Sequence, residues 1–133
     1  MIVLDTHALL WWVNGDSQLS QHASDVIEHE MQAEGGGILI SAISAWEIAL
    51  LVEKGRLTLS MAIDDWLDTV EEIEAVRIVA LDTATAVEST RLPGEFHKDP
   101  ADRMIVALAR HVNAELVTAD EKITAYRHVR TVW

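Results

Sequence analysis

Short apolar runs alternate with segments of helical periodicity along the whole chain. The candidate strands fall at residues 1–4, 38–41, 77–81, 115–118 and 129–133. Runs that are apolar at every position are typical of strands buried on both faces of a parallel sheet. Because helical segments separate them, they predict parallel βαβ units in a three-layer α/β fold. The expected architecture is a central parallel sheet of four to five strands flanked by helices.

Capping and breaking residues place the expected helices between these strands. One helix should begin directly after Asp5, and others should span 20–33, 44–54, 60–74, 82–92 and 99–111. Ser20, Ser44 and Ser60 are candidate N-caps, and Gly55 is a candidate C-cap. The run Gly35–Gly37 precedes a strand and lacks the Lys and Ser/Thr of a P-loop, so we interpret it as a flexible turn.

Length and composition narrow the class of protein. With 133 residues and half of them hydrophobic, the chain suits one domain covering 1–133. The absence of cysteine excludes a disulfide scaffold and thiol catalysis, and it fits a cytoplasmic protein. The N-terminal apolar run follows no cationic segment and is too short to span a bilayer, so neither secretion nor membrane insertion is expected.

The negative charge of the chain is unevenly distributed. The net charge is -12, and residues 1–90 hold 16 acids against only 3 bases. Residues 91–133 hold 7 bases and 6 acids. Nucleic-acid affinity normally comes from Lys and Arg, so a polyanion must be met by the C-terminal third or through a metal ion.

Four acids share one expected position in the fold. Asp5 and Asp120 follow the ends of candidate strands, while Glu47 and Asp102 fall in the first turns of helices on the same side of the sheet. In a parallel sheet these positions lie along one edge, and ligands of open α/β sheets bind there. Of the four, Asp5 is the hardest to explain locally, because the sequence offers little backbone reason for a carboxylate at that point.

Structural explanations compete with a functional one for the remaining acids. Glu47 follows Ser44 at the spacing of a capping box, so it has an alternative role in closing a helix. Asp99 before Pro100 is best interpreted as an N-cap. Asp102 would also complement a helix dipole, and Asp120 would also start a turn.

A cluster of these acids requires a cation. Two carboxylates about 4 Å apart repel each other by about 4 kcal/mol at an effective dielectric constant of 20. Oxygen ligands without cysteine or paired histidines select a hard ion such as Mg²⁺, with Mn²⁺ as a substitute. Such an ion would also join an acidic protein to a phosphate.

Four motifs in register carry a family resemblance across nearly the whole chain. They are Asp5–Trp11, Ser44–Ala49, His97–Ala107 and Leu116–Asp120. Together they resemble the motifs of PIN domains, specifically the VapC-like toxins of bacterial toxin–antitoxin pairs. Lys98 and Ala101 stand where many relatives have Arg and Phe, which leaves the acids unchanged.

The resemblance implies a metal-dependent endoribonuclease held inactive by a cognate VapB-like antitoxin, and it suggests a homodimer. Asp5, Glu47, Asp102 and Asp120 would then form the acidic catalytic pocket. Asp5 and Asp102 are the first choices as Mg²⁺ ligands, with Glu47 and Asp120 completing the site or positioning water. Water activated by the ion would attack the phosphodiester of an RNA substrate, so no nucleophilic side chain is needed.

Five further residues are assigned supporting roles, four of them by the resemblance and His97 by its place in the loop before Asp99. Thr6 and Thr118 would orient ligands or the attacking water. Asp99 would cap its helix and support the site, Arg103 would serve the structure or contact the substrate backbone, and His97 is a candidate substrate contact.

Two alternatives come from other functional classes. A receiver-type signalling domain would share the length, the sheet and an acidic Mg²⁺ pocket, with Asp82 as the phosphoacceptor. Against it, the first strand ends in a single acid, and no Lys follows Thr118 where that class requires one. The second alternative is a catalytically silent interaction module, which would cleave no RNA with any divalent ion.

Overall fold

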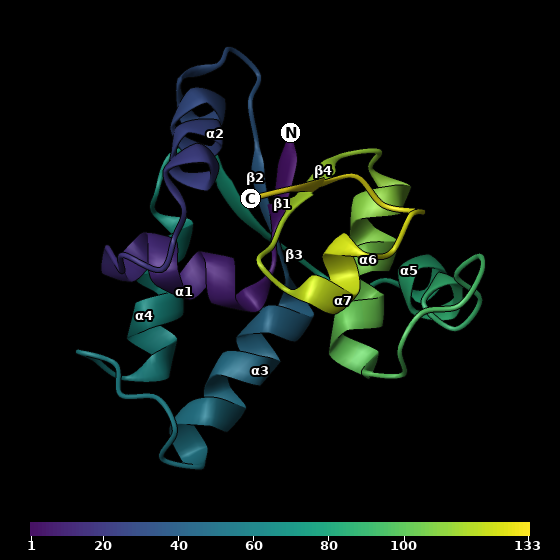
Figure 1. The fold of residues 1–133 in the computed structure, drawn as a ribbon. Coiled ribbons are helices and arrows are strands. Elements are labelled where there is room, and N and C mark those ends of the chain that lie inside the picture. Colours follow the sequence, from purple (N-terminus) through teal and green to yellow (C-terminus); the bar gives the residue numbers. More distant parts are fainter.

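Five parallel strands form one central sheet (Figure 1). The computed structural model describes residues 1–133, and the sheet order is β3-β2-β1-β4-β5. The strands are β1 (Ile2–Leu4), β2 (Ile38–Ser41), β3 (Val76–Val79), β4 (Glu115–Val117) and β5 (Thr131–Val132). All four pairings are parallel, so the predicted parallel sheet is confirmed.

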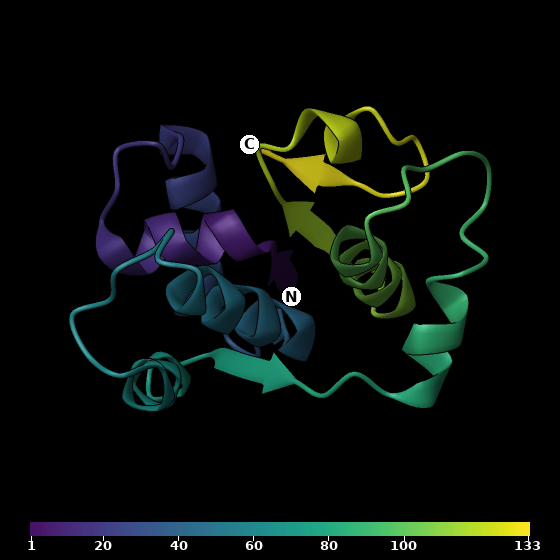
Figure 2. The same ribbon diagram turned by 90° about the horizontal axis from the view of Figure 1, so that it is seen from below.

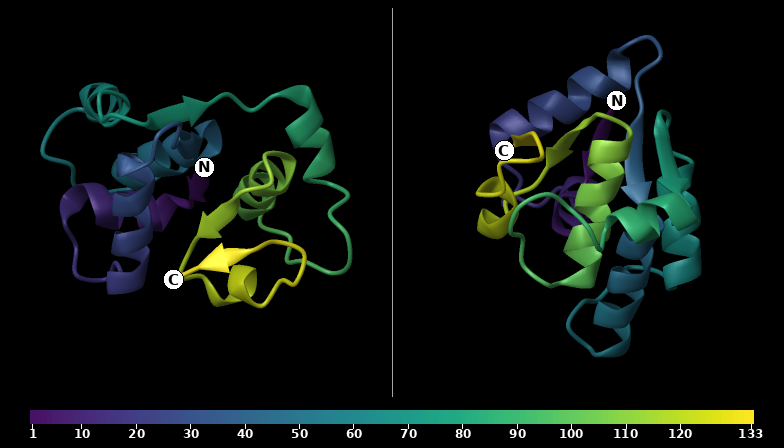
Figure 3. Two further views of the ribbon diagram at one scale, coloured as in Figure 1. Left: turned by 90° about the horizontal axis from the view of Figure 1, so that it is seen from above. Right: turned by 90° about the vertical axis from the view of Figure 1, so that its right-hand side faces the viewer.

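Helices cover both faces of the sheet, which gives the predicted three layers (Figures 2 and 3). One face carries mainly α1 (Thr6–Asn14), α2 (Gln21–Gln32), α3 (Ala42–Glu53) and α4 (Ile63–Glu71). The other carries α5 (Thr83–Glu88), α6 (Pro100–His111) and α7 (Glu121–Thr124). No helix has both the length and the hydrophobicity that crossing a bilayer would require.

The central strand β1 serves two hydrophobic cores. Ile2 and Leu4 point into the core beneath α1 to α4, whereas Val3 points into the core beneath α6. All three residues are buried. Because successive side chains of a strand alternate between faces, a strand covered on both sides must be apolar throughout.

The order of the strands reverses beside β1. The chain passes from β1 to β2 and β3 on one side, and β4 then pairs with the other side of β1. This reversal is the topological switch point at which open α/β sheets bind ligands, beyond the carboxyl ends of the strands. Leu4 of β1 pairs with Val117 of β4, so Asp5 and Thr118, the residues that follow the two strands, lie side by side.

Two predicted helix starts were wrong. Helix α3 begins at Ala42 with Ser41 as its N-cap, because the Ser41 hydroxyl accepts from Ile43 N at 3.2 Å. The same serine ends β2, so the strand leads directly into the helix and Ser44 becomes buried within it. Helix α4 starts at Ile63 rather than Ser60, with no side-chain cap.

Helix α5 is shorter than its apolar pattern predicted. It ends at Glu88 instead of near Leu92. The hydroxyls of Ser89 and Thr90 donate to backbone carbonyls three residues earlier, at 2.6 and 2.7 Å, which satisfies groups that a longer helix would have bonded. The single turn α7 had not been predicted, and its N-cap is Asp120, which was predicted at the acidic edge with a turn start as its alternative role.

Candidate active site

Asp5 closes β1 and begins α1. Its Oδ1 accepts from Ala8 N at 2.8 Å, which makes it the N-cap of α1, and the Thr118 hydroxyl donates to its Oδ2. The expectation that Asp5 has no local backbone role was therefore wrong. The residue is only 7% exposed, so its carboxylate is largely withdrawn from solvent at the carboxyl end of β1.

Thr6 connects the end of β1 to α3. Its hydroxyl donates to Glu47 Oε1 at 2.6 Å and lies 2.9 Å from Ser44 Oγ. Glu47 lies in the second turn of α3, so the capping-box interpretation of this residue was wrong. Its half-buried carboxylate instead faces the end of β1, held there by Thr6.

The first turn of α6 brings two further acids. Asp99 is the N-cap of α6, as predicted, and its Oδ1 accepts from Asp102 N at 3.0 Å. Asp102 is half-buried and is the third residue of the helix. His97 Nε2 lies 3.0 Å from Asp102 Oδ2, although the ring is not oriented for a hydrogen bond. The nearest partner of His97 is therefore a member of the acidic cluster.

Asp120 reaches the site through the end of β4. Its backbone N–H donates to Thr118 Oγ1 at 3.1 Å, while the Thr118 hydroxyl serves Asp5. The Asp120 side chain accepts from Lys122 N at 2.8 Å and caps α7. Thr118 is completely buried, so a single hydroxyl links two of the predicted acids.

The carboxylates act on one another electrostatically. Burial and the nearby negative charges of Asp99, Asp120, Glu47 and Asp5 together raise the pKa of Asp102 to about 7, with burial as the largest cause and the four charges following in that order. Asp102 therefore lies within electrostatic range of Asp99 and of the three other predicted acids, although they come from distant parts of the chain.

Burial is also the largest cause of the raised pKa values of two other acids of the site, Asp5 and Glu47. It raises the pKa of Asp5, against the opposing hydrogen bonds from Thr118 and Ala8 N. It likewise raises the pKa of Glu47, against the opposing hydrogen bond from Thr6. The two threonines thus favour the ionised forms of the carboxylates that they contact.

The chemistry of this donor set fits a hard divalent ion. Carboxylate oxygens are the ligands that Mg²⁺ and Mn²⁺ prefer. As the side chains stand, no three His, Asp or Glu groups are placed to hold one ion together. Mg²⁺ does not require such a cage, since it usually keeps several waters and binds through one or two carboxylates plus substrate phosphates.

Comparison with known proteins identifies the family. A family model described as PIN domain matches residues 2–129. The chain belongs to the PIN domain family. The resemblance predicted from four motifs is thereby confirmed.

Individual relatives of this PIN domain agree in both sequence and fold. Ribonuclease VapC22 of Mycobacterium tuberculosis (strain ATCC 25618 / H37Rv) is 37% identical over 134 residues, covering 99% of this chain and 98% of the relative. VapBC2 from Rickettsia felis, bound to a promoter DNA fragment, superposes with a TM-score of 0.72 at 20% identity, covering 99% and 98% of the two chains. FitAcB from Neisseria gonorrhoeae gives 0.69 at 18% identity, covering 100% and 97%.

The PIN-domain geometry gives no support to the receiver alternative. Asp82 follows β3, the edge strand two positions away from β1. It is exposed, and its Oδ1 accepts from Thr85 N at 2.8 Å as the N-cap of α5. The same hydrogen bond lowers the pKa of Asp82. This carboxylate serves a helix start outside the acidic cluster.

Two residues beside the acids had been given other roles or left aside. Ser44, interpreted as a cap, instead lies against Thr6 inside the site. Trp46 is 55% exposed and borders a hollow of about 300 Å³, together with Glu47 and Asp99. Its place directly before a predicted acid was the available sequence signal.

Arg103 has a structural role in this PIN domain. Its guanidinium donates to the carbonyls of Ser89, Phe96 and His97 at 2.7, 3.0 and 3.1 Å. These bonds fix the segment between α5 and α6. That segment contains His97 and places it beside Asp102. Of the two roles expected for Arg103, the contacts support the structural one.

Replacing Arg103 with alanine should therefore lower the free energy of unfolding by about 2–4 kcal/mol, because three carbonyls lose a charged donor. Lysine should restore little of this, since it lacks the planar fork of arginine. Urea denaturation measures the effect. Arg91→Ala is the control, because Arg91 makes only an exposed pair with Glu88 and should change stability by less than about 1 kcal/mol. A loss for Arg103→Ala no larger than the control would contradict the structural role.

The raised acid pKa values predict an unusual dependence of stability on pH. A carboxyl whose pKa is about 7 when folded and about 3.9 when unfolded stabilises the fold fully below about pH 4 and loses that contribution as pH rises through about 7. Asp5 and Glu47 shift in the same direction. With divalent ions removed by EDTA, unfolding at about pH 8 should require about 1–2 kcal/mol less than at about pH 5.5. Equal stability at the two pH values would contradict the gathered acids.

Proposed function

We propose that this PIN domain, acting as a single domain over residues 1–133, is a metal-dependent endoribonuclease of the VapC type and the toxin of a toxin–antitoxin pair. The observation that carries the proposal is the convergence of Asp5, Glu47, Asp102 and Asp120 at the switch point of the sheet. The name of its relative, Ribonuclease VapC22, supports the ribonuclease assignment. The named VapBC and FitAcB neighbours support an antitoxin partner.

Asp5 and Asp102 are the proposed direct or water-mediated ligands of Mg²⁺, with Mn²⁺ as a substitute. Glu47 and Asp120 complete the site or position water. When bound, such an ion supplies Lewis-acid stabilisation of the phosphoryl oxygens and a water of lowered pKa. The requirement for it follows from electrostatics, since the carboxylates raise one another's cost of ionisation.

The remaining site residues hold these carboxylates in place. Thr118 donates to Oδ2 of Asp5, whose Oδ1 accepts from Ala8 N, so both oxygens of this carboxylate are fixed. Thr6 donates to Oε1 of Glu47 and leaves Oε2 without a hydrogen bond in the fold. Asp99 caps α6 through the backbone of Asp102 and adds negative charge beside it. His97 is proposed to contact the substrate, next to Asp102.

The acidic pocket also suits an inhibitor. Arginine pairs with carboxylates in a bidentate manner, and the chain carries a net charge of -12. We expect a VapB-like antitoxin to present a basic segment with arginine at this pocket, and the active toxin to be a cytoplasmic homodimer. Unchanged antitoxin affinity after neutralising the four acids would argue against this mode of inhibition.

Incubating the purified chain with single-stranded and structured RNA tests the function. Cleavage should require Mg²⁺ or Mn²⁺ and should stop in EDTA. Failure to cleave any RNA with any divalent ion would favour a silent interaction module. A stable phosphate adduct on Asp82 after treatment with a small phosphodonor would instead favour a receiver domain. Mapping transcript and tRNA ends after brief expression would then identify the target.

A further inference from the structure

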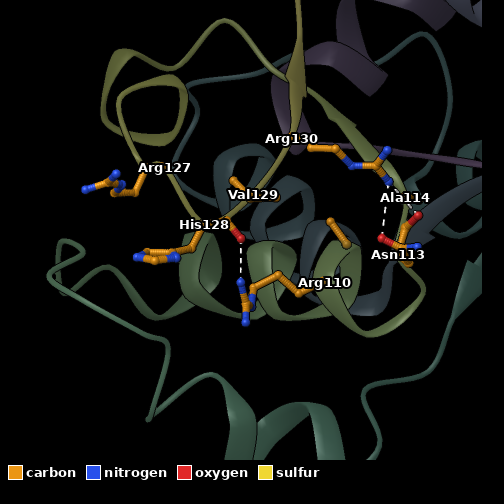
Figure 4. Close-up of a pocket in the computed structure, with 8 residues that line it drawn as sticks. Arg110, Asn113, Ala114, Arg127, His128, Val129 and Arg130 are labelled. Carbon is orange, nitrogen blue, oxygen red and sulfur yellow. Dashed lines mark hydrogen bonds between the residues drawn. The ribbon is translucent and has the colours of Figure 1, made fainter.

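Arginines line a hollow in the fold (Figure 4). It lies near the amino ends of β4 and β5, whereas Asp5 and Asp120 follow the carboxyl ends of β1 and β4. This arginine pocket, formed around Arg110, Arg127 and Arg130, has a volume of about 430 Å³. Asn113 and His128 also line it, and no acidic residue does. Arg110 belongs to the last turn of α6, and Arg130 directly precedes β5, so the pocket faces the amino ends of the strands.

The positive charge of this pocket is not neutralised within the fold. None of the three arginines forms a salt bridge with an acidic side chain. They are three of only 10 basic residues in a chain of net charge -12. The pocket therefore brings three positively charged side chains together without an acidic residue among them.

Backbone contacts hold two of the guanidinium groups and leave donors available. Arg110 Nη1 donates to the His128 carbonyl, while its buried Nε has no partner. Arg130 Nη2 donates to Asn113 O at 2.8 Å. Arg127 is exposed and donates no hydrogen bond within the fold. A helix dipole accounts for a basic residue at Arg110, but it does not account for Arg127, which lies beyond α7.

A row of packed rings connects the arginine pocket to the acids. Phe96 contacts the rings of His97 and Tyr126 at centroid distances of 4.5 and 4.6 Å, and Tyr126 lies 5.4 Å from His128. One end of the row is His97, which lies 3.0 Å from Asp102. The other end is His128, which lines the pocket. Contiguous packing thus fixes the pocket relative to the candidate active site.

The distance between the two sites suits a nucleic-acid strand. Asp102 and Arg110 lie on the same helix. Their eight-residue separation corresponds to about 12 Å along the helix axis. At a stacked spacing of about 3.4 Å per nucleotide, a strand passing beside α6 covers this distance with about four nucleotides.

We propose that the arginine pocket binds backbone phosphates of the RNA strand that flanks the cleavage position. The inference rests on the proposed ribonuclease function and adds a second point of contact with the substrate. Arginine guanidinium groups match phosphate oxygens with paired donors. Such a contact would hold the RNA strand where it leaves the metal site of a protein whose net charge is -12.

Phosphate fits the pocket better than an acidic peptide does. Its lining is mostly polar, since Asn113, Arg127, His128 and Arg130 are exposed, Arg110 and Val129 are half-buried, and Ala109 and Ala114 are buried. A docked peptide normally needs an apolar anchor at the centre of its interface. Backbone phosphates need only charge and hydrogen-bond donors, which this pocket offers.

Equilibrium binding of RNA to the full chain tests the proposal. Asp102→Asn serves as the background, so that bound RNA is not cleaved, and single-stranded RNAs of about 16 and about two nucleotides serve as probes, the shorter being too short to span the two sites. Adding Arg127→Ala should weaken binding of the longer RNA about tenfold. The slope of log affinity against log salt should fall by about 0.7, the value of one phosphate contact on a single strand. The shorter RNA, which occupies only the acidic site, should bind equally well.

The matched control is Arg56→Ala, which changes the charge equally at an exposed position beyond α3. Arg56→Ala should leave the affinities for both RNAs unchanged. Arg127→Glu should weaken binding of the longer RNA more than Arg127→Ala does. Equal affinity of the longer RNA with and without Arg127, or equal losses for Arg56→Ala, would overturn the proposal. Binding of polyglutamate that depends on Arg127 while RNA binding does not would assign the pocket to an acidic peptide. Failure of the ribonuclease itself is seen separately, as absent cleavage by the unmodified chain.

Discussion

Asp102→Asn is expected to abolish RNA cleavage while making the metal-free protein more stable at about pH 8. Activity should fall more than about 100-fold, because loss of partners that merely support metal ligands already costs about 10–100-fold. Asparagine keeps the shape of the side chain and the backbone N–H that Asp99 caps. The substitution removes the negative charge of Asp102, whose ionisation all the neighbouring carboxylates disfavour.

The stability gain has a calculable direction. At about pH 8 the folded protein must keep Asp102 ionised although its pKa is about 7, so removing the charge should contribute about 1–2 kcal/mol. A smaller loss, about 0.3–1 kcal/mol, follows from removing an acid in the first turn of α6. Urea denaturation in EDTA should find the variant more stable at that pH and less dependent on pH than the unmodified chain.

Asp68→Asn is the control for this experiment, since Asp68 is exposed on α4 and makes no side-chain hydrogen bond in the fold. It changes the net charge equally and should leave both activity and pH dependence unaltered. Retained cleavage by Asp102→Asn, or a large loss of its stability, would refute the assignment of Asp102 to the metal site.

Thr118→Val is expected to reduce cleavage about 10–100-fold, the usual effect of removing a group that orients a metal ligand. Valine preserves the shape of this buried residue but not its hydroxyl. Asp5 Oδ2 then loses its donor, and Asp120 N loses its acceptor. Because the Thr118 hydrogen bond favours ionised Asp5, the pKa of Asp5 should rise further without it.

Serine should rescue the Thr118 variant, which separates orientation from simple packing. Cleavage rates measured across pH should place the acidic limb of the Thr118→Val profile at higher pH than in the unmodified chain. Metal-free stability should also fall, by about 1–3 kcal/mol, through the buried groups left unpaired. If Thr118→Val and Thr118→Ser behave alike, the hydroxyl does not position Asp5.

The strands and the convergence of the acids were predictable because both depend on local patterns plus one rule of topology. A run that is apolar on both faces identifies a buried parallel strand, and the residue after it must lie at the carboxyl edge. This placed Asp5 and Asp120 correctly without any knowledge of strand order. The motifs then related Glu47 and Asp102 to the same edge.

The start of α3 was not predictable in the same way. Ser41 and Ser44 both have side chains suited to an N-cap, and propensity does not choose between them. The choice depends on where β2 stops pairing with its neighbours, which is a tertiary property. A shift of three residues decides whether Glu47 closes its own helix or contacts Thr6.

The role of Asp5 as an N-cap was missed for a different reason. The signal was present, since aspartate directly before a helix is a favoured cap, but a functional explanation of the same residue obscured it. The contact of His97 with Asp102 and the grouping of Arg110 with Arg130 had no signal at all. Both depend on the path of irregular segments, for which the sequence carries no periodicity.

The position of β1 at the centre of the sheet also constrains when the acids can assemble during translation. Asp5 emerges from the ribosome 113 residues ahead of its hydroxyl donor, Thr118. Contacts between such distant positions are slow to form, because the loop between them must close first. A growing or prematurely terminated polypeptide that lacks Thr118 therefore lacks the assembled acids, and the cell meets a competent nuclease only after this contact has formed.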